Sequence, residues 1–214
     1  MNVLLLHAWP PDERMWEPQL GAVREVGFEP IAPRLYGRGS SLDGWAAQLL
    51  GEVEGPFVAV GASMGGYCAL ALARRAPERV VGLVLVGSRP AADSEERRRY
   101  RDEIAARLRS EGVPADYDTD VPAEEFAVAQ EAMRDRPDYS SVVSSFGGPL
   151  LVCVGDRDEI VSVGEARATA ESALLGSLEV FSGAGHLLST EQPEQFNSLL
   201  QDFLGRWRTS TATS

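Results

Sequence analysis

Short, continuous runs of apolar residues recur along the chain, and they define the expected strands. Their odd and even positions are both apolar, which is typical of strands buried on both faces of a parallel sheet. The clear runs occupy residues 3–6, 57–60, 80–86 and 150–154, and weaker candidates lie at 28–32 and 178–181. The pattern therefore predicts about six strands.

Amphipathic, helix-like patterns separate these runs. The expected helices are 16–26, 43–53, 64–76, 93–111, 122–134, 163–175 and 191–207. Because strand and helix alternate, the sequence predicts one α/β domain over residues 1–214, with a doubly wound, mainly parallel sheet and helices on both faces. Ligands of such sheets bind beyond the carboxyl ends of the strands, so functional residues are sought just after each apolar run.

The interval 88–148 interrupts this alternation, since it contains no convincing strand. It holds a charged helix, "DSEERRRYRDEIAARLRSEG", then a Pro- and Asp-rich connection and a second helix that begins near "VPAEEFAVAQEAM". We interpret 88–148 as a helical cap or lid insertion at the active end of the sheet. Within it, "EERRRYR" is interpreted as a solvent-exposed helix face rather than a binding patch.

Composition and charge narrow the possible functions. A chain of 214 residues with 44% hydrophobic residues can bury one sizeable core. Its formal net charge of -12 argues against nucleic acid or an anionic membrane as a partner. All 20 basic residues are arginine, which excludes a lysine phosphate loop and Schiff-base chemistry. No signal peptide or membrane-spanning run is recognisable, so we expect a cytoplasmic protein.

Ser63 lies in a Gly-x-Ser-x-Gly pattern at residues 61–65, between an apolar run and a helix-like pattern. This context is the one expected of a nucleophile elbow, a sharp strand-to-helix turn that exposes the serine hydroxyl. The small neighbours allow tight backbone packing, and the following helix N-terminus supplies amides suited to an oxyanion. The alternative is a glycine-rich turn with an idle serine.

A serine nucleophile needs a base, and the chain has only two histidines, His7 and His186. Each follows an expected strand, so either could lie at the active end. Asp156 and Asp158 follow the run 150–154 and are both candidates for the acid that orients the imidazole. A calcium loop is excluded, because the residues at 160 and 161 are Ile and Val.

The chain order of Ser63, an aspartate and His186 resembles that of the α/β-hydrolase fold family. The opening "LLLHAWPPDERMWEPQL" resembles the family's His-Gly oxyanion segment, and "APRLYGRGSS" resembles its Gly-x-Gly-x-Ser loop. The resemblance covers nearly the whole chain. It implies an all-parallel six-stranded sheet here, since the antiparallel pair that usually opens the fold has no counterpart in the sequence.

The resemblance also assigns roles. The family's acid occupies the last position of Gly-x-x-D, which favours Asp158 and leaves Asp156 a structural role. His186 matches the general base, and His7 matches the histidine that shapes the oxyanion loop. Two departures are Ala8, where the family usually has glycine, and Arg34, where it usually has aspartate.

Acyl transfer to water is the chemistry that this resemblance implies. The backbone amides of Met64 and Trp9 would form the oxyanion hole, and Trp9, Trp16 and Leu187 would line a pocket for a small or medium acyl group. The expected partner is a small-molecule ester, lactone or thioester, with no metal and no organic cofactor. Carbon–carbon bond hydrolysis on the same fold and a ligand-binding or signalling protein with little turnover remain the alternatives.

Overall fold

A single parallel sheet organises the chain. The computed structural model describes residues 1–117 and 119–208. Its strands are β1 (Asn2–Leu6), β2 (Glu29–Ile31), β3 (Phe57–Ala62), β4 (Val80–Val86), β5 (Leu150–Gly155) and β6 (Gly176–Phe181). They are ordered β2-β1-β3-β4-β5-β6, and every neighbouring pair is parallel, so the predicted fold class is confirmed.

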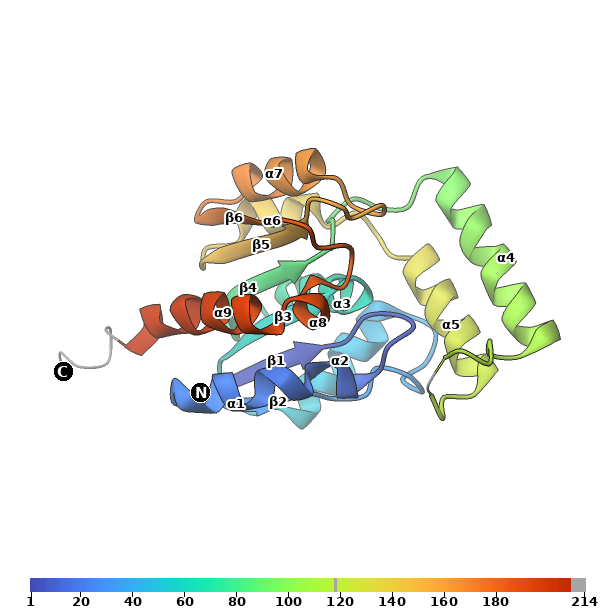
Figure 1. Ribbon diagram of the computed structural model, residues 1–214, viewed down its shortest axis with the longest axis horizontal. Helices are drawn as coiled ribbons and strands as arrows, with labels where there is room; N and C mark the ends of the chain where they lie inside the picture. Colours follow the sequence, from blue (N-terminus) through green and yellow to red (C-terminus); the bar gives the residue numbers. More distant parts are fainter. Residues whose placement is uncertain (118, 209–214) are drawn as a thin grey trace.

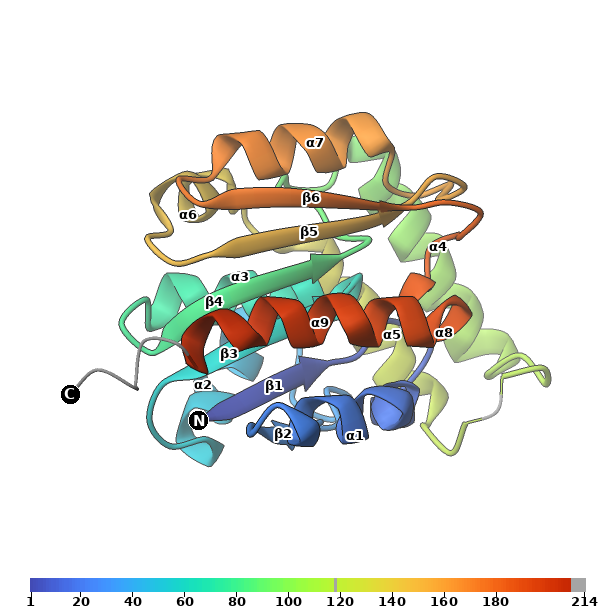
Figure 2. The same cartoon turned by 60° about the vertical axis from the view of Figure 1, so that its left-hand side comes forward.

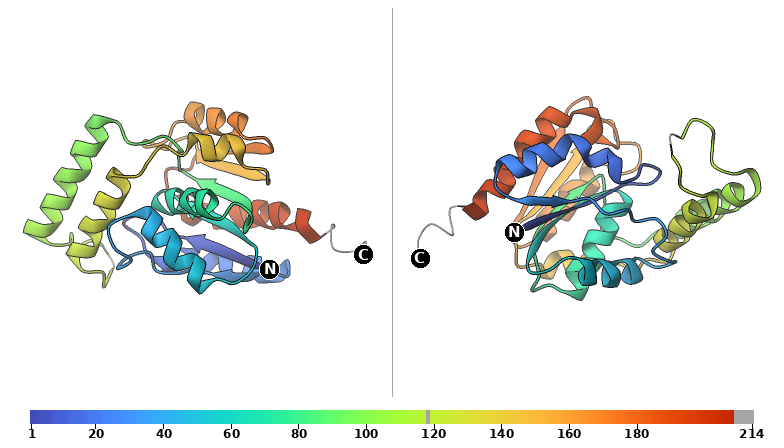
Figure 3. Two further views of the ribbon diagram at one scale, coloured as in Figure 1. Left: turned by 180° about the vertical axis from the view of Figure 1, so that it is seen from behind. Right: turned by 90° about the horizontal axis from the view of Figure 1, so that it is seen from below.

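Helices cover both faces of the sheet, as Figures 1 and 2 show. One face carries α1 (Glu17–Glu25) and α9 (Pro193–Arg208), which pack against each other. The opposite face, seen from behind in Figure 3, carries α2 (Leu42–Glu52), α3 (Met64–Arg75), α6 (Ser140–Ser145) and α7 (Val163–Ser172). Two short helices, η1 (Glu13–Trp16) and α8 (Leu188–Glu191), precede α1 and α9 respectively.

The continuous apolar runs follow from this double coverage. In β4, Leu83 and Leu85 point into the core beneath α2 and α3, whereas Val84 and Val86 point into the core beneath α1 and α9. All four side chains are inaccessible to solvent. A strand between two helical layers therefore has no polar face, which is why its sequence does not alternate.

Two helices stand beyond the carboxyl edge of the sheet. They are α4 (Glu95–Glu111) and α5 (Ala123–Arg134), and they pack against each other away from the two main helical layers (Figure 1). The third helix of the interval 88–148, α6, instead packs against α3 and α7. Of the helices in this interval, only α4 and α5 therefore lie beyond the carboxyl edge, so the segment there is shorter than 88–148. No helix of residues 1–117 and 119–208 is long and apolar enough to cross a membrane.

The strand order places the first and third strands side by side within the sheet. β1 pairs with β2 on one side and β3 on the other, with Leu6 opposite Gly61. The chain order thus reverses between β1 and β3, and this switch point opens a crevice beyond the carboxyl ends. The segment after β1 and the turn after β3 meet there.

Candidate active site

Ser63 occupies a strained turn between β3 and α3. Its φ of 49° and ψ of -109° make it the one non-glycine residue with positive φ among the described residues. Its N–H donates to the carbonyl of Val86 at 2.8 Å, which ties the turn to the neighbouring strand β4. A conformation of this kind persists only where the surroundings enforce it, and it is concentrated at functional sites.

The glycines around Ser63 permit the close approach of three segments. A Cβ on Gly65 would overlap the backbone carbonyl of Leu6 at the end of β1, and a Cβ on Gly61 would overlap the carbonyl of Gly65. A Cβ on Gly66 would overlap the side chain of Ser88 after β4. The small residues of the sequence pattern are therefore required by packing as well as by turn geometry.

A hydrogen-bonded chain joins Ser63 to His186 and Asp158. The Ser63 Oγ lies 2.9 Å from His186 Nε2, and His186 Nδ1 lies 2.8 Å from Asp158 Oδ2. The Asp158 side chain is fully buried, and 17% of the His186 side chain is exposed. The hydroxyl faces the imidazole nitrogen that can accept its proton, and the carboxylate faces the other nitrogen.

Two opposing influences set the pKa of Asp158. Burial acts to raise it, but the hydrogen bond from His186, the positive charge that His186 can carry, and two backbone amides act to lower it. Those amides belong to Ile160 and Val161 and donate to Oδ1 at 2.8 and 3.0 Å. The pKa of Asp158 is lowered overall, so the carboxylate is ionised at neutral pH.

Asp156, the second candidate for the acid, forms hydrogen bonds with the turn after β6. Its Oδ1 accepts the Gly183 N–H at 2.7 Å, and its Oδ2 accepts the Ser182 hydroxyl at 3.3 Å. These bonds join the loop after β5 to the loop after β6. The structure thus brings Asp158, and not Asp156, to the imidazole of His186.

His7 lies in the core and shapes the loop after β1. Its Nε2 accepts the Leu35 N–H at 2.8 Å, so Nδ1 carries the proton and donates to the Ala8 carbonyl, also at 2.8 Å. The ring is fully buried, and this burial lowers its pKa from 6.5 to about 4. A neutral histidine with both nitrogens bonded to the backbone is a fixed structural element.

The loop fixed by His7 lies beside the turn that carries Ser63. The Ala8 N–H is directed to the Met15 sulfur at 3.2 Å. The N–H groups of Trp9 and Met64 donate to no protein acceptor within the described part of the chain. Two backbone donors are thus available at the meeting point of β1 and β3, where an oxyanion hole is expected.

The sequence did not identify three residues that support the candidate site. The Glu191 carboxylate accepts the N–H groups on both sides of His186, from Gly185 at 2.6 Å and Leu187 at 3.0 Å. Gly87 has a φ of 55°, and a Cβ there would meet His186 Nδ1 at 3.0 Å. The Ser88 hydroxyl donates to the Ser63 carbonyl at 3.0 Å. No motif marks these positions, since their roles depend on how the loops fold.

A cavity of about 680 Å³ opens onto Ser63 and His186. Trp9 and Leu187, both expected at the pocket, line it. Trp16 does not: it is fully buried on the opposite face of the sheet, with its ring 6.1 Å from that of Phe196. The prediction for Trp16 is wrong because η1 turns that side chain beneath α9 instead of toward the crevice.

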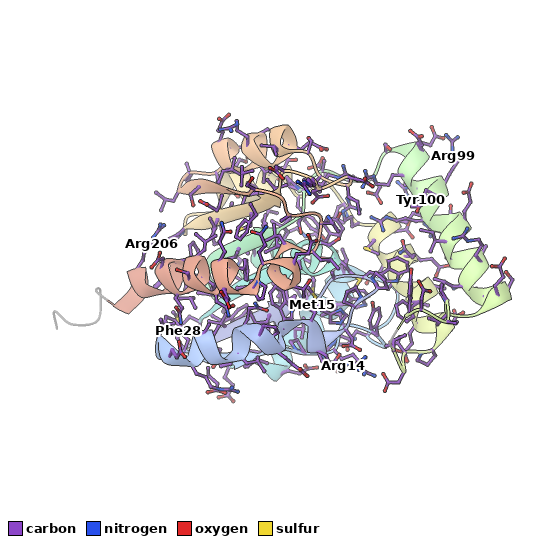
Figure 4. All side chains as sticks on the ribbon, in the orientation of Figure 1. Arg14, Met15, Phe28, Arg99, Tyr100 and Arg206 are labelled. Carbon is purple, nitrogen blue, oxygen red and sulfur yellow. The ribbon has the colours of Figure 1, made fainter. Side chains whose placement is uncertain are left out.

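Helices α4 and α5 form the remaining wall of the cavity. Arg97, Tyr100, Arg101 and Ile104 of α4 line it, together with Gln130 and Met133 of α5. Figure 4 labels Tyr100 and its exposed neighbour Arg99 on α4. The interpretation of "EERRRYR" as a solvent-exposed face agrees with the exposure of most of its residues, but it missed that one side of α4 also lines the cavity.

Among residues 1–117 and 119–208, no three His, Cys, Asp or Glu side chains are grouped in a way that could hold a metal ion. Cys68 and Cys153 are both free and buried, and burial raises the pKa of Cys68 to about 12. A buried thiol of this kind is inert.

A parallel sheet with a serine on a strained strand-to-helix turn, hydrogen-bonded to a histidine and an aspartate from later loops, defines the class of α/β hydrolases. Residues 3–199 match the Alpha/beta hydrolase family, and the chain belongs to that family. The resemblance stated from the sequence is confirmed.

Several relatives of known description are similar to parts or all of the chain. A pimeloyl-[acyl-carrier protein] methyl ester esterase of Aromatoleum aromaticum is 37% identical over 95 residues, which are 42% of this chain and 38% of that protein. The biotin biosynthesis bifunctional protein BioHC of Cellvibrio japonicus is 23% identical over 94% of this chain and 47% of its own length. The chain thus spans less than half of these two relatives. A 2-hydroxymuconate semialdehyde hydrolase of Pseudomonas sp. is 28% identical over 94% of this chain and 86% of that protein.

Solved structures agree on the fold. An esterase from Thermogutta terrifontis superimposes with a TM-score of 0.86 and 29% identity, over 96% of this chain and 90% of that one. The enol-lactonase from Burkholderia xenovorans has a TM-score of 0.80 at 22% identity, over 94% of this chain and 90% of its own, which is evidence of a shared fold alone.

Proposed function

We propose that this chain is a serine hydrolase that cleaves a carboxylic ester, lactone or thioester of a small to medium acyl group through an acyl-enzyme on Ser63. The observation that carries the proposal is the hydrogen-bonded chain from Ser63 through His186 to Asp158, with separations of 2.9 and 2.8 Å. These separations place each group within hydrogen-bond reach of the next, as proton transfer from the serine requires.

The reaction divides into two acyl transfers. His186 takes the Ser63 proton as the hydroxyl oxygen attacks the substrate carbonyl, and the ionised Asp158 stabilises the resulting imidazolium. The free amides of Met64 and Trp9 stabilise the oxyanion as it develops. His186 then returns the proton to the leaving alcohol, and a water molecule activated by the same base releases the acid and regenerates Ser63.

The cavity and the relatives guide the choice of substrate class. A volume of about 680 Å³ suits a small or medium ligand, and Trp9, Ile104, Met133 and Leu187 supply apolar walls. The Thermogutta and Aromatoleum relatives are described as esterases, which favours an ester. In this proposal α4 and α5 act as the cap that shields the acyl group from bulk water.

The first test asks about the nucleophile without requiring the natural substrate. The protein is treated with a fluorophosphonate and its intact mass is measured. Wild type should gain one adduct and Ser63→Ala none. Ser94→Ala is the matched control, since Ser94 lines the same cavity without a histidine partner, and it should gain the adduct as wild type does. An adduct that persists on Ser63→Ala would refute the assignment.

The alternative is a binding protein on this fold with little turnover. Folded wild type that gains no adduct would favour it over the hydrolase. If the adduct forms, esters, lactones, thioesters and carbon–carbon substrates are compared by kcat/KM. The carbon–carbon class is included because one relative is described as a 2-hydroxymuconate semialdehyde hydrolase.

A further inference from the structure

Arg97 brings an unpaired positive charge into the cavity that contains Ser63. It lies in the first turn of α4, where its backbone N–H donates to the Ser94 hydroxyl, and its side chain lines the cavity together with Ser63 and His186. Within the described part of the chain, its guanidinium makes no hydrogen bond or ion pair. The residue is half-buried, so water compensates this charge only in part.

Three other arginines near this cavity, Arg89, Arg101 and Arg136, differ from Arg97 because each has an acidic partner. Arg101 donates to Asp93 and also bonds Gln130 at 2.9 Å, and Arg136 lies 2.8 Å from the other carboxylate oxygen of Asp93. Arg89 pairs with Glu165 at 3.1 Å. The buried carboxylate of Asp93 is thus already paired with two guanidinium groups, those of Arg101 and Arg136, and it makes no ion pair with Arg97. Arg97 is therefore left without a paired carboxylate among the described residues, although the formal net charge of the chain is -12.

Two acidic side chains also line the cavity, but they do not neutralise Arg97. Glu96 and Glu159 are exposed, and neither bonds the guanidinium. Burial lowers the pKa of Arg97, and so does the nearby positive charge of Arg89, against smaller opposing effects that include Asp93. The immediate surroundings thus disfavour the cation, and a bound anion would restore its stability.

We propose that the cavity accepts esters that carry a free carboxylate, and that Arg97 binds this carboxylate while the scissile carbonyl lies at Ser63. A guanidinium binds a carboxylate through two parallel hydrogen bonds, which gives orientation as well as affinity. The inference rests on the proposed hydrolase function and names its substrate class. Arg97 is then a specificity-determining residue, since it contacts the substrate away from the reacting atoms.

The test compares charged and neutral substrates of equal length. In the acyl arm, mono-4-nitrophenyl adipate is compared with 4-nitrophenyl hexanoate; in the alcohol arm, the butyrate ester of glycolate is compared with propyl butyrate. In one arm, wild type should prefer the carboxylate, and Arg97→Gln should lower the charged-to-neutral ratio of kcat/KM by about 10- to 100-fold, mainly through KM. Arg97→Lys should retain part of the preference.

Arg99→Gln is the matched control. Arg99 is exposed on the same helix and does not line the cavity, so its loss removes an equal charge without touching the proposed site. The ratio should stay at the wild-type value in this variant. If the charged-to-neutral ratio of kcat/KM falls by a similar factor in Arg99→Gln and Arg97→Gln, the effect is one of long-range electrostatics, and the assignment of Arg97 is overturned.

A binding measurement separates this inference from the hydrolase proposal. Adipate and hexanoate are titrated calorimetrically into wild type and Arg97→Gln. Adipate should bind wild type more tightly, with the advantage lost in Arg97→Gln, whether or not esters are cleaved. If no ester is cleaved but this advantage is observed, the hydrolase proposal fails and the anion site stands. An unchanged kcat/KM ratio in both arms, or equal adipate binding by the two proteins, overturns the inference.

Discussion

Replacement of Asp158 by asparagine tests the proposed direction of proton transfer. The new side-chain oxygen would keep the two backbone donors from Ile160 and Val161, which lie at 2.8 and 3.0 Å. The amide NH₂ would then face His186 Nδ1 and donate to it, so the imidazole proton would move to Nε2. That nitrogen lies 2.9 Å from the Ser63 hydroxyl and could no longer accept its proton. The corresponding change in a Ser-His-Asp protease lowers kcat by about 10⁴-fold, and we expect a loss of about 10³- to 10⁴-fold here.

The assay is kcat for 4-nitrophenyl butyrate, measured at a pH about one unit above the ordinary pKa of histidine, so at about pH 7.5. Thermal unfolding of each variant serves as a check on the fold. Asp156→Asn is the control. In wild type the Gly183 N–H lies 2.7 Å from the Asp156 carboxylate, and the amide oxygen of the asparagine can still accept this N–H. We therefore expect kcat to change less than about threefold. A loss below about tenfold in Asp158→Asn would refute the tautomer argument. A larger loss in Asp156→Asn would move the acid by two residues.

Three further predictions concern the support of the site. Gly65→Ala should destabilise the protein by at least about 3 kcal/mol in urea unfolding, because its Cβ would overlap the Leu6 carbonyl; an unchanged midpoint would contradict this. The pKa of His7 is about 4 in the folded protein, against the ordinary value of 6.5. As the pH falls, His7 is therefore protonated in the unfolded chain before it is protonated in the folded protein. His7 should therefore contribute a fall of roughly 3 kcal/mol in the free energy of unfolding between pH 7 and 4, and His7→Gln should lack that part of the slope. Glu191→Ala should lower kcat about tenfold with little change in KM, because both backbone amides that flank His186 lose their acceptor. Glu191→Gln should recover part of this loss. Equal kcat values in wild type and both variants would exclude a positioning role for Glu191.

Much of the fold was predictable because burial on two faces leaves a strong signal. The apolar runs marked the strands, and even the weaker run at 28–32 contained β2, a short strand at the sheet edge. The helix α6 was missed, since "SSVVSS" is short and mostly polar. The expected helix 191–207 is interrupted: α8 ends at Glu191 and α9 begins at Pro193, because proline disfavours helical geometry in the residue before it.

The candidate site was predictable only in part, because sequence order fixes which strand a residue follows and not where its side chain points. The elbow pattern located Ser63, and the position after the last strand located His186. Asp156 and Asp158 follow the same strand, so spacing alone left both open, and only the fold directs one of them to the imidazole. Trp16 lies close to Trp9 in sequence, yet the turn between them places the two rings on opposite faces of the sheet.

The side of α4 that faces the cavity shows why substrate specificity is the least predictable property. Residues 97, 100, 101 and 104 recur at helical spacing, but they are Arg, Tyr, Arg and Ile, so they form no apolar stripe. A charged helix face on a cap is usually solvated, and nothing in "EERRRYR" separates Arg97 from Arg99. Burial and position separate them, because Arg97 is half-buried and lines the cavity, whereas Arg99 is exposed and does not line it. If Arg97 selects the substrate, its role comes from its half-buried place in the cavity without an acidic partner among the described residues, which is a property that only the three-dimensional arrangement reveals.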